Sequence, residues 1–209
     1  MASKNKYKKA RLRIHPITII TLGLILGAVI VAIVLSIPSK GTRLANKFRD
    51  AATDIGAYQN SELSNDNNVK KITSVNKAFN VINKNDKEAV VIVIGSFESV
   101  FAVSNIGVFY QEFNLGVNLD DNGKNTGPKM SDFANFYFYD YGKLEKGLDR
   151  VKELLDKLGL DIEIDEDDPA LILTFVGGQL AVNSKDITLP QRNDVARKMF
   201  RNTIDIINK

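Results

Sequence analysis

The side chains that most often act as nucleophiles and proton carriers are scarce in this sequence. It contains no cysteine and a single histidine, His15. A disulfide, a thiolate metal ligand and a thiol nucleophile are therefore excluded. Ser99 is a candidate nucleophile, but a serine hydroxyl needs a positioned base. Because the residues around Ser99 match neither the Gly-x-Ser-x-Gly pattern nor the Ser-x-x-Lys pattern, we expect Ser99 to cap a helix or to lie on the surface.

A second motif resembles part of a calcium-binding loop. Asn118, Asp120 and Asn122 supply oxygen ligands at positions one, three and five, and Gly123 stands at position six. Position twelve normally carries a glutamate that binds the ion through both oxygens, and here it is Lys129. Since the motif loses a ligand and gains a cation, we predict a flexible polar turn, with no metal and no other cofactor.

A run of acidic residues precedes Pro169. Ile162 and Ile164 alternate with some of them, which indicates an edge strand whose exposed side is charged. Two interpretations of the run stay open, a solvated loop and a docking surface for a partner of opposite charge. The acidic residues are Asp161, Glu163, Asp165, Glu166, Asp167 and Asp168.

The first fifth of the chain predicts a membrane anchor. Residues 17–37 contain no charged side chain, and as a helix they are long enough to cross a bilayer. Six Lys and Arg side chains between Lys4 and Arg13 precede this segment. By the positive-inside rule the N-terminus is cytosolic and the rest is extracytoplasmic, in a single-pass protein of the cell membrane. No Ala-x-Ala-like site follows, so we favour an uncleaved signal anchor over a cleaved signal peptide.

Two further interpretations concern the anchor and the overall charge. Gly23 and Gly27 are four residues apart, which lets two membrane helices approach closely and form a homodimer; glycine is also common in such helices without pairing. The formal net charge is +3. Removing the six basic residues of the tail from the 28 Lys and Arg leaves 22, against 25 Asp and Glu. The composition therefore gives no case for nucleic-acid binding.

These patterns divide the chain into four parts. They are a cytosolic basic tail (1–15), a transmembrane helix (16–38), a juxtamembrane helix with a linker (39–68) and an extracytoplasmic domain (69–209). The juxtamembrane helix follows from apolar residues at helical spacing, and the linker follows from the Ser, Asn, Asp and Glu of residues 59–68. The apolar residues of that helix are Leu44, Phe48, Ala52 and Ile55.

Inside the domain we expect an α/β fold with a central mixed sheet flanked by helices. Residues 89–94 are apolar at every position, which is typical of a central strand covered on both faces. Around it the pattern predicts helices within 75–82, 103–113, 144–158 and after Pro190, a strand at 136–139, a polar loop over 116–131, and a hairpin over 170–182 that turns at Gly177-Gly178.

This order, a βαβ unit followed by a hairpin and a closing helix, resembles the thioredoxin fold over residues 69–209. Residues 91–95 are similar to the central strand that leads to the active site in bacterial membrane-anchored thioredoxin-like accessory proteins. Residues 168–179 are similar to the family's cis-proline, strand and turn, with Pro169 as the cis-proline. In that family a Cys-x-x-Cys motif opens the helix after the central strand. Here the corresponding positions are Ser99, Val100, Phe101 and Ala102, so the resemblance implies a redox-inactive domain.

Two classes of function follow. The first is a protein-interaction module, an adaptor, accessory subunit or chaperone-like protein that uses the groove beside Pro169. Its partner would bind a surface that joins Phe97 and Phe101 to the acidic residues Asp165, Glu166, Asp167 and Asp168. For either phenylalanine, a place in the core is the alternative. The second class is an extracytoplasmic enzyme that uses non-thiol chemistry on the same scaffold.

Overall fold

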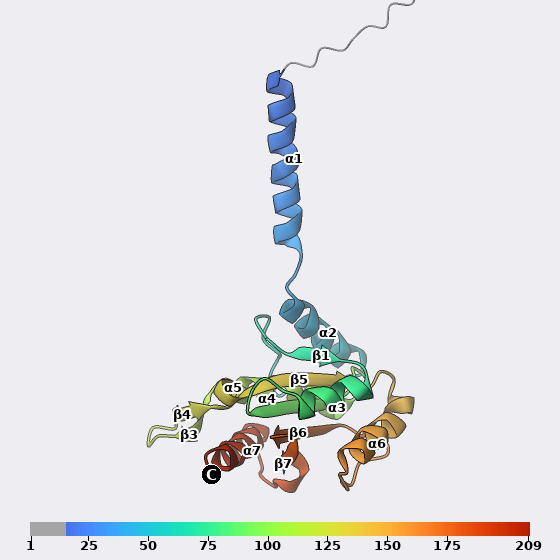
Figure 1. Cartoon of the computed structure of the whole chain (residues 1–209), viewed down its shortest axis with the longest axis vertical. Coiled ribbons are helices and arrows are strands. Elements are labelled where there is room, and N and C mark those ends of the chain that lie inside the picture. Colours follow the sequence, from blue (N-terminus) through green and yellow to red (C-terminus); the bar gives the residue numbers. More distant parts are fainter. Residues whose placement is uncertain (1–15) are drawn as a thin grey trace, which may run out of the picture. The chain divides into compact units, whose positions relative to one another are not determined.

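A computed structural model describes residues 16–209 of the chain and divides it into two compact units, one ending at Pro38 and one spanning Ser39–Lys209. In the first unit, helix α1 (Pro16–Ser36) is long and apolar enough to cross a membrane (Figure 1). This confirms one helix in the predicted anchor segment. The predictions for the basic tail and His15 fall on residues 1–15, outside the described residues.

The second unit is built on a five-stranded mixed sheet, as the sequence predicts. Its strands lie in the order β1-β5-β2-β6-β7. β1, β5 and β2 are parallel, β6 is antiparallel to β2, and β7 is antiparallel to β6. Every residue of β2 is buried, in agreement with its predicted central position. The strands are β1 (Lys70–Ile72), β2 (Ala89–Gly95), β5 (Ala134–Asp140), β6 (Leu171–Val176) and β7 (Gln179–Asn183).

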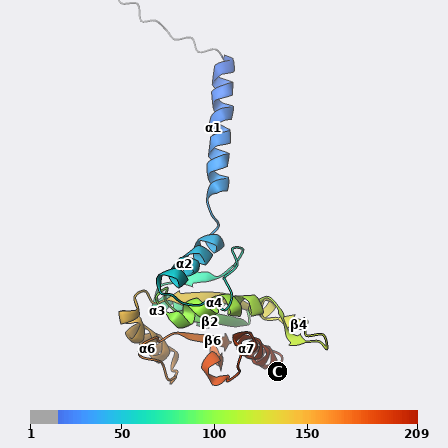
Figure 2. The same ribbon diagram turned by 180° about the vertical axis from the view of Figure 1, so that it is seen from behind.

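Helices cover both faces of this sheet (Figures 1 and 2). Val91 and Val93 of β2 belong to the core shared with α2 (Lys40–Asp54), α4 (Val100–Phe113) and α7 (Arg192–Ile207). The alternate residues Val90, Ile92 and Ile94 belong to the core shared with α3 (Val75–Asn83) and α6 (Gly147–Leu158). Successive side chains of a strand point to opposite faces, so one apolar strand serves both cores.

The predicted juxtamembrane helix is part of the domain. In α2, Leu44 and Phe48 are buried in the same core as α4. The polar stretch after α2 is also packed, because the Asn60 amide donates to the Ser104 carbonyl at 3.1 Å and Leu63 is buried. A Cβ at Gly107 would lie 1.9 Å from the Ser61 carbonyl oxygen, so glycine lets this stretch cross α4. The folded unit therefore begins at Ser39, and the predicted boundary at residue 69 lies within it.

Three local predictions differ from the structure. The three-residue strand β1 was not expected. The predicted polar loop contains the hairpin β3 (Gly116–Leu119) and β4 (Asn125–Lys129), then the short helix α5 (Met130–Phe133). The acidic run forms no strand, although Ile162 and Ile164 both pack against the core beside α6, as their alternation with the acids predicts. Short 3₁₀ turns, η1 (Leu144–Lys146) and η2 (Ser184–Asp186), precede α6 and follow β7.

Candidate functional site

The start of α4 is closed by a carboxylate from a distant loop. Ser99 is the N-cap, as the sequence predicts, and its Oγ accepts a hydrogen bond from the Ala102 amide at 3.0 Å. The same hydroxyl donates to Asp168 Oδ1 at 2.6 Å, and Asp168 Oδ2 accepts from the Phe101 amide at 2.9 Å. The first amides of a helix lack intrahelical acceptors and favour negative charge. Asp168 therefore supplies the acceptor and the charge that this helix end requires.

Pro169 follows directly and is buried. No peptide bond among the described residues is cis, so the bond between Asp168 and Pro169 is trans and the expected cis-proline is wrong. The trans form is the lower-energy isomer of an X–Pro bond. With this trans bond, both carboxylate oxygens of Asp168 accept hydrogen bonds at the start of α4.

A hollow of about 480 Å³ lies beside this closed helix start; we call it the α4 hollow. Its apolar lining includes Val100 and Tyr58, whose exposed fractions are 54% and 80%. Phe101 also lines it, half-buried, with the Arg192 guanidinium 5.6 Å from its ring centroid. Asp165 and Asp168 contribute negative charge, and Arg192 and Lys185 contribute positive charge. The α4 hollow thus combines exposed apolar groups with charges of both signs.

The structure brings together only part of the predicted docking surface. Phe101, Asp165 and Asp168 line the α4 hollow, whereas Glu166 and Asp167 are exposed and are not among its lining residues. Asp165 Oδ1 accepts from the amides of Asp167 and Asp168 at 2.9 and 3.4 Å, which makes this segment a tight turn.

Phe97 lies elsewhere. Its ring contacts those of Phe48 and Phe138, with centroids 4.9 and 5.5 Å apart. The ammonium groups of Lys71 and Lys47 lie over the same ring, at 4.7 and 5.9 Å from its centroid. Phe97 therefore covers the core beneath α2 and is not among the residues that line the α4 hollow.

Two buried tyrosines lie in β5 and just after it. Burial raises the pKa of Tyr139 to about 12, and the hydroxyl of Tyr139 has no hydrogen-bond partner within the described residues. Burial also raises the pKa of Tyr141 to about 12; the Asp168 carboxylate adds to this shift, and the Ser96 and Ser99 hydroxyls oppose it. The anionic form of both tyrosines is thus disfavoured, and Tyr141 is the one near Ser99 and Asp168 at the start of α4.

The calcium-like motif forms the turn between β3 and β4. Asp120 Oδ1 accepts from the amides of Asn122 and Lys124 at 3.0 and 2.8 Å, so this oxygen satisfies the backbone of the turn. Between residues 16 and 209 the structure shows no cluster of three or more His, Asp or Glu side chains placed to hold a metal ion.

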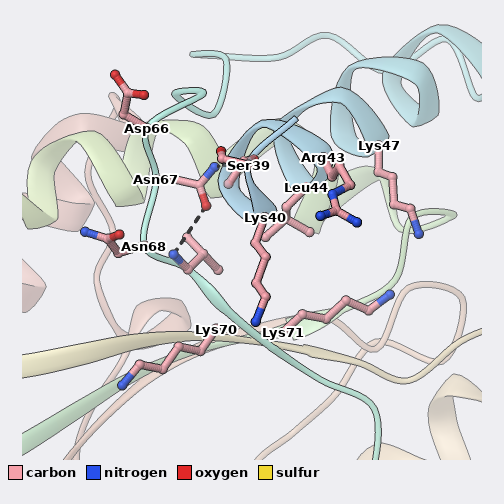
Figure 3. A pocket seen from close by; sticks show the side chains of 12 residues that line it. Ser39, Lys40, Arg43, Leu44, Lys47, Asp66, Asn67, Asn68, Lys70 and Lys71 are labelled. Atoms are coloured by element: carbon pink, nitrogen blue, oxygen red, sulfur yellow. Dashed lines mark hydrogen bonds between the residues drawn. The ribbon is translucent and has the colours of Figure 1, made fainter. Parts of the chain in front are cut away.

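A larger hollow, which the sequence analysis missed, lies between α2 and β1; we call it the basic cavity. Its volume is about 840 Å³. Figure 3 shows the side chains that line it. A signal for it is visible in retrospect, because Lys40, Arg43 and Lys47 are spaced to share one face of a helix. The other basic residues that line this cavity are Lys70 and Lys71, and they belong to β1, the strand that was not expected.

Comparisons of the chain with protein-family models, with curated proteins and with solved structures find no match. What the protein does is therefore inferred from its own residues. Of the sites predicted from the sequence, the start of α4 is the one where several of the predicted residues meet.

Proposed function

We propose that the protein is a membrane-anchored, redox-inactive, thioredoxin-like interaction module whose domain binds a protein partner outside the cytosol. The anchor would be α1, since it is long and apolar enough to span a bilayer. The basic residues between Lys4 and Arg13 favour a cytosolic N-terminus and an extracytoplasmic Ser39–Lys209.

The order of elements supports the thioredoxin-like assignment. β2, α4 and β5 form a parallel βαβ unit, β6 and β7 form an antiparallel hairpin, and α7 closes the chain. In this arrangement α4 is the helix that would carry the active site, and Ser99 to Ala102 occupy its first turn. The trans bond at Pro169 is a second departure from the family pattern, in addition to the missing Cys-x-x-Cys motif.

The closed start of α4 is the observation that carries a non-catalytic role. The Ser99 side chain is fully buried, and its hydroxyl both donates and accepts within the fold. A nucleophile must reach its substrate, so Ser99 in this state is a structural residue. The alternative, an enzyme using non-thiol chemistry, would require Ser99 and Asp168 to separate and to expose this hydroxyl.

The α4 hollow is the surface that we assign to the partner. Val100 and Tyr58 are large apolar side chains left exposed at its lining, and such groups act as anchors in protein interfaces. We propose that the partner inserts an apolar side chain beside them. A basic side chain of the partner would lie opposite Asp165, which affects the rate of association more than the final affinity.

Co-purification after chemical crosslinking in intact membranes tests this role. The double variant Tyr58→Ala, Val100→Ala should lose the crosslinked partner while keeping the thermal stability of the wild type, because both side chains are exposed. The matched control is Leu119→Ala in the β3–β4 hairpin, where the side chain is 47% exposed and outside the α4 hollow. A partner that is retained by the double variant would contradict the proposal.

A further inference from the structure

The basic cavity has walls from two elements that are close neighbours in the fold. The start of α2 forms one wall and β1 forms another, and residues 66–69, which lead into β1, complete the lining. In Figure 3 the Lys40 side chain extends from α2 toward β1. The lining residues that carry charge are Lys40, Arg43, Lys47, Asp66, Lys70 and Lys71.

Positive charge dominates this lining. Among the residues that line the cavity within Ser39–Lys209, Asp66 is the one acid against five basic side chains. Lys71 is partly neutralised by Asp140, with 2.6 Å between ammonium nitrogen and carboxylate oxygen. Lys40 and Lys47 form no ion pair with any residue from 16 to 209. The ammonium groups of Lys47 and Lys71 both lie over the Phe97 ring, so an anion beside them would offset their mutual repulsion. The Lys70 side chain points away from Lys47 (Figure 3), and its ammonium donates to the Asn135 side chain and lies over the Tyr137 ring.

One side of the cavity is formed by close packing of residues 65–67 against the start of α2. A Cβ at Gly41 would lie 2.4 Å from the Asn67 carbonyl oxygen, so glycine lets the segment at 65–67 press against the helix start. The Asn67 side-chain amide is buried and donates to the Gly41 carbonyl at 2.9 Å. Ser39 caps α2 by accepting from the Thr42 amide at 3.0 Å. The helix start adds the partial positive charge of its first amides to the lysines around it.

We propose that the basic cavity binds the phosphate group of an anionic membrane lipid. Phosphate oxygens accept hydrogen bonds from lysine and arginine side chains and match the charge of the lining. Leu44 and Val69 also line the cavity, and the partly exposed Val69 would contact the hydrocarbon of such a lipid.

Chain connectivity favours a lipid over a free anion. This step rests on the proposed function, in which α1 spans the membrane. Only Ile37, Pro38 and Ser39 separate the last residue of α1 from the first residue of α2. An extended chain covers at most about 3.6 Å per residue, so the start of α2 stays within about 15 Å of the end of a membrane-spanning α1. Lipid headgroups are then the phosphates present at the highest local concentration.

Native mass spectrometry of the full chain in detergent tests the proposal by counting bound lipids. The probes are phosphatidylglycerol, phosphatidylcholine and inorganic phosphate. The test variant is Lys40→Gln, Lys47→Gln, and the control variant Lys143→Gln, Lys146→Gln removes the same charge from an exposed turn outside the cavity. The wild type and the two variants share the same basic tail, so phosphatidylglycerol bound to that tail adds equally to the lipid count of each.

Wild type and control should retain one more phosphatidylglycerol than the test variant, with no difference for phosphatidylcholine. Equal retention by all three chains would overturn the proposal, as would an equal loss in both variants. Inorganic phosphate that competes with phosphatidylglycerol at equal concentration would also overturn it, because the source would then be a free anion. Resistance of each chain to alkaline extraction from membranes reports separately on the anchor, so a failure of anchoring is recognised as such.

Discussion

At the scale of single residues, Asp168 is the side chain that completes the start of α4. It is 69 residues from Ser99 in sequence and accepts hydrogen bonds from Ser99 Oγ and from the Phe101 amide. The sequence predicted the cap, because serine is a preferred N-cap residue. It could not predict the second acceptor, because the contact depends on how β6 is placed beside β2.

Replacing Asp168 should therefore cost stability. We expect Asp168→Ala to lower the free energy of unfolding by about 2 kcal/mol, since it leaves the buried Ser99 hydroxyl without an acceptor and removes a charge from the helix start. Asp167→Ala is the control, because Asp167 is exposed, and it should change stability by less than about 0.5 kcal/mol. Urea denaturation measures both, and equal effects would show that Asp168 does not stabilise α4.

The buried tyrosines predict a specific dependence on pH. Their pKa values are raised to about 12 from an ordinary value of 10, so the fold favours the neutral form. This contribution is fully present below pH 10 and is lost as the pH rises toward 12. Each tyrosine should lower the free energy of unfolding by up to about 1.4 kcal/mol per pH unit in that window. In the double variant Tyr139→Phe, Tyr141→Phe, the free energy of unfolding should fall less steeply as the pH rises from 10 to 12. An unchanged slope would mean that other groups govern this pH dependence.

At the scale of elements, α2 is the main revision to the predicted organisation. Its amphipathic pattern was visible, but a pattern shows that a helix buries one face and does not show against what. In the structure α2 packs through Phe48 against the rings of Phe97 and Phe138. β1 could not be predicted, because only one residue of Lys70–Ile72 is buried. The hairpin of β3 and β4 was missed because Val117 and Leu119 are the only branched apolar residues of its two strands, and because its turn depends on side-chain hydrogen bonds.

Because α2 belongs to the core, a cavity in it should destabilise the whole unit. Phe48 is fully buried, and Phe48→Ala should cost about 3–5 kcal/mol in the free energy of unfolding. The control Tyr58→Ala, an exposed aromatic just beyond the helix, should cost less than about 0.5 kcal/mol. Thermal or urea denaturation of the full chain in detergent distinguishes the two. A small effect of Phe48→Ala would mean that α2 is a separate juxtamembrane element.

At the scale of the whole molecule, the absence of cysteine makes the proposed topology directly measurable. A single cysteine at Lys143, which is exposed, should react with a membrane-impermeant maleimide in intact cells. A single cysteine at Ser3 should react only after lysis, because the basic tail is expected in the cytosol. The reverse pattern would contradict the orientation, and labelling of both positions in intact cells would contradict a membrane-spanning α1.

The central claim is that a protein partner docks at the α4 hollow, and site-specific photocrosslinking tests it most directly. A photoreactive amino acid is placed at Val100, inside the hollow, and in a second chain at Leu119, outside it. Both side chains are exposed to a similar extent, so each reports contact without disturbing the core. The account predicts a discrete crosslinked species from position 100 that disappears with Tyr58→Ala, and none from position 119. The same species from both positions, or one from position 100 that Tyr58→Ala leaves unchanged, would contradict it.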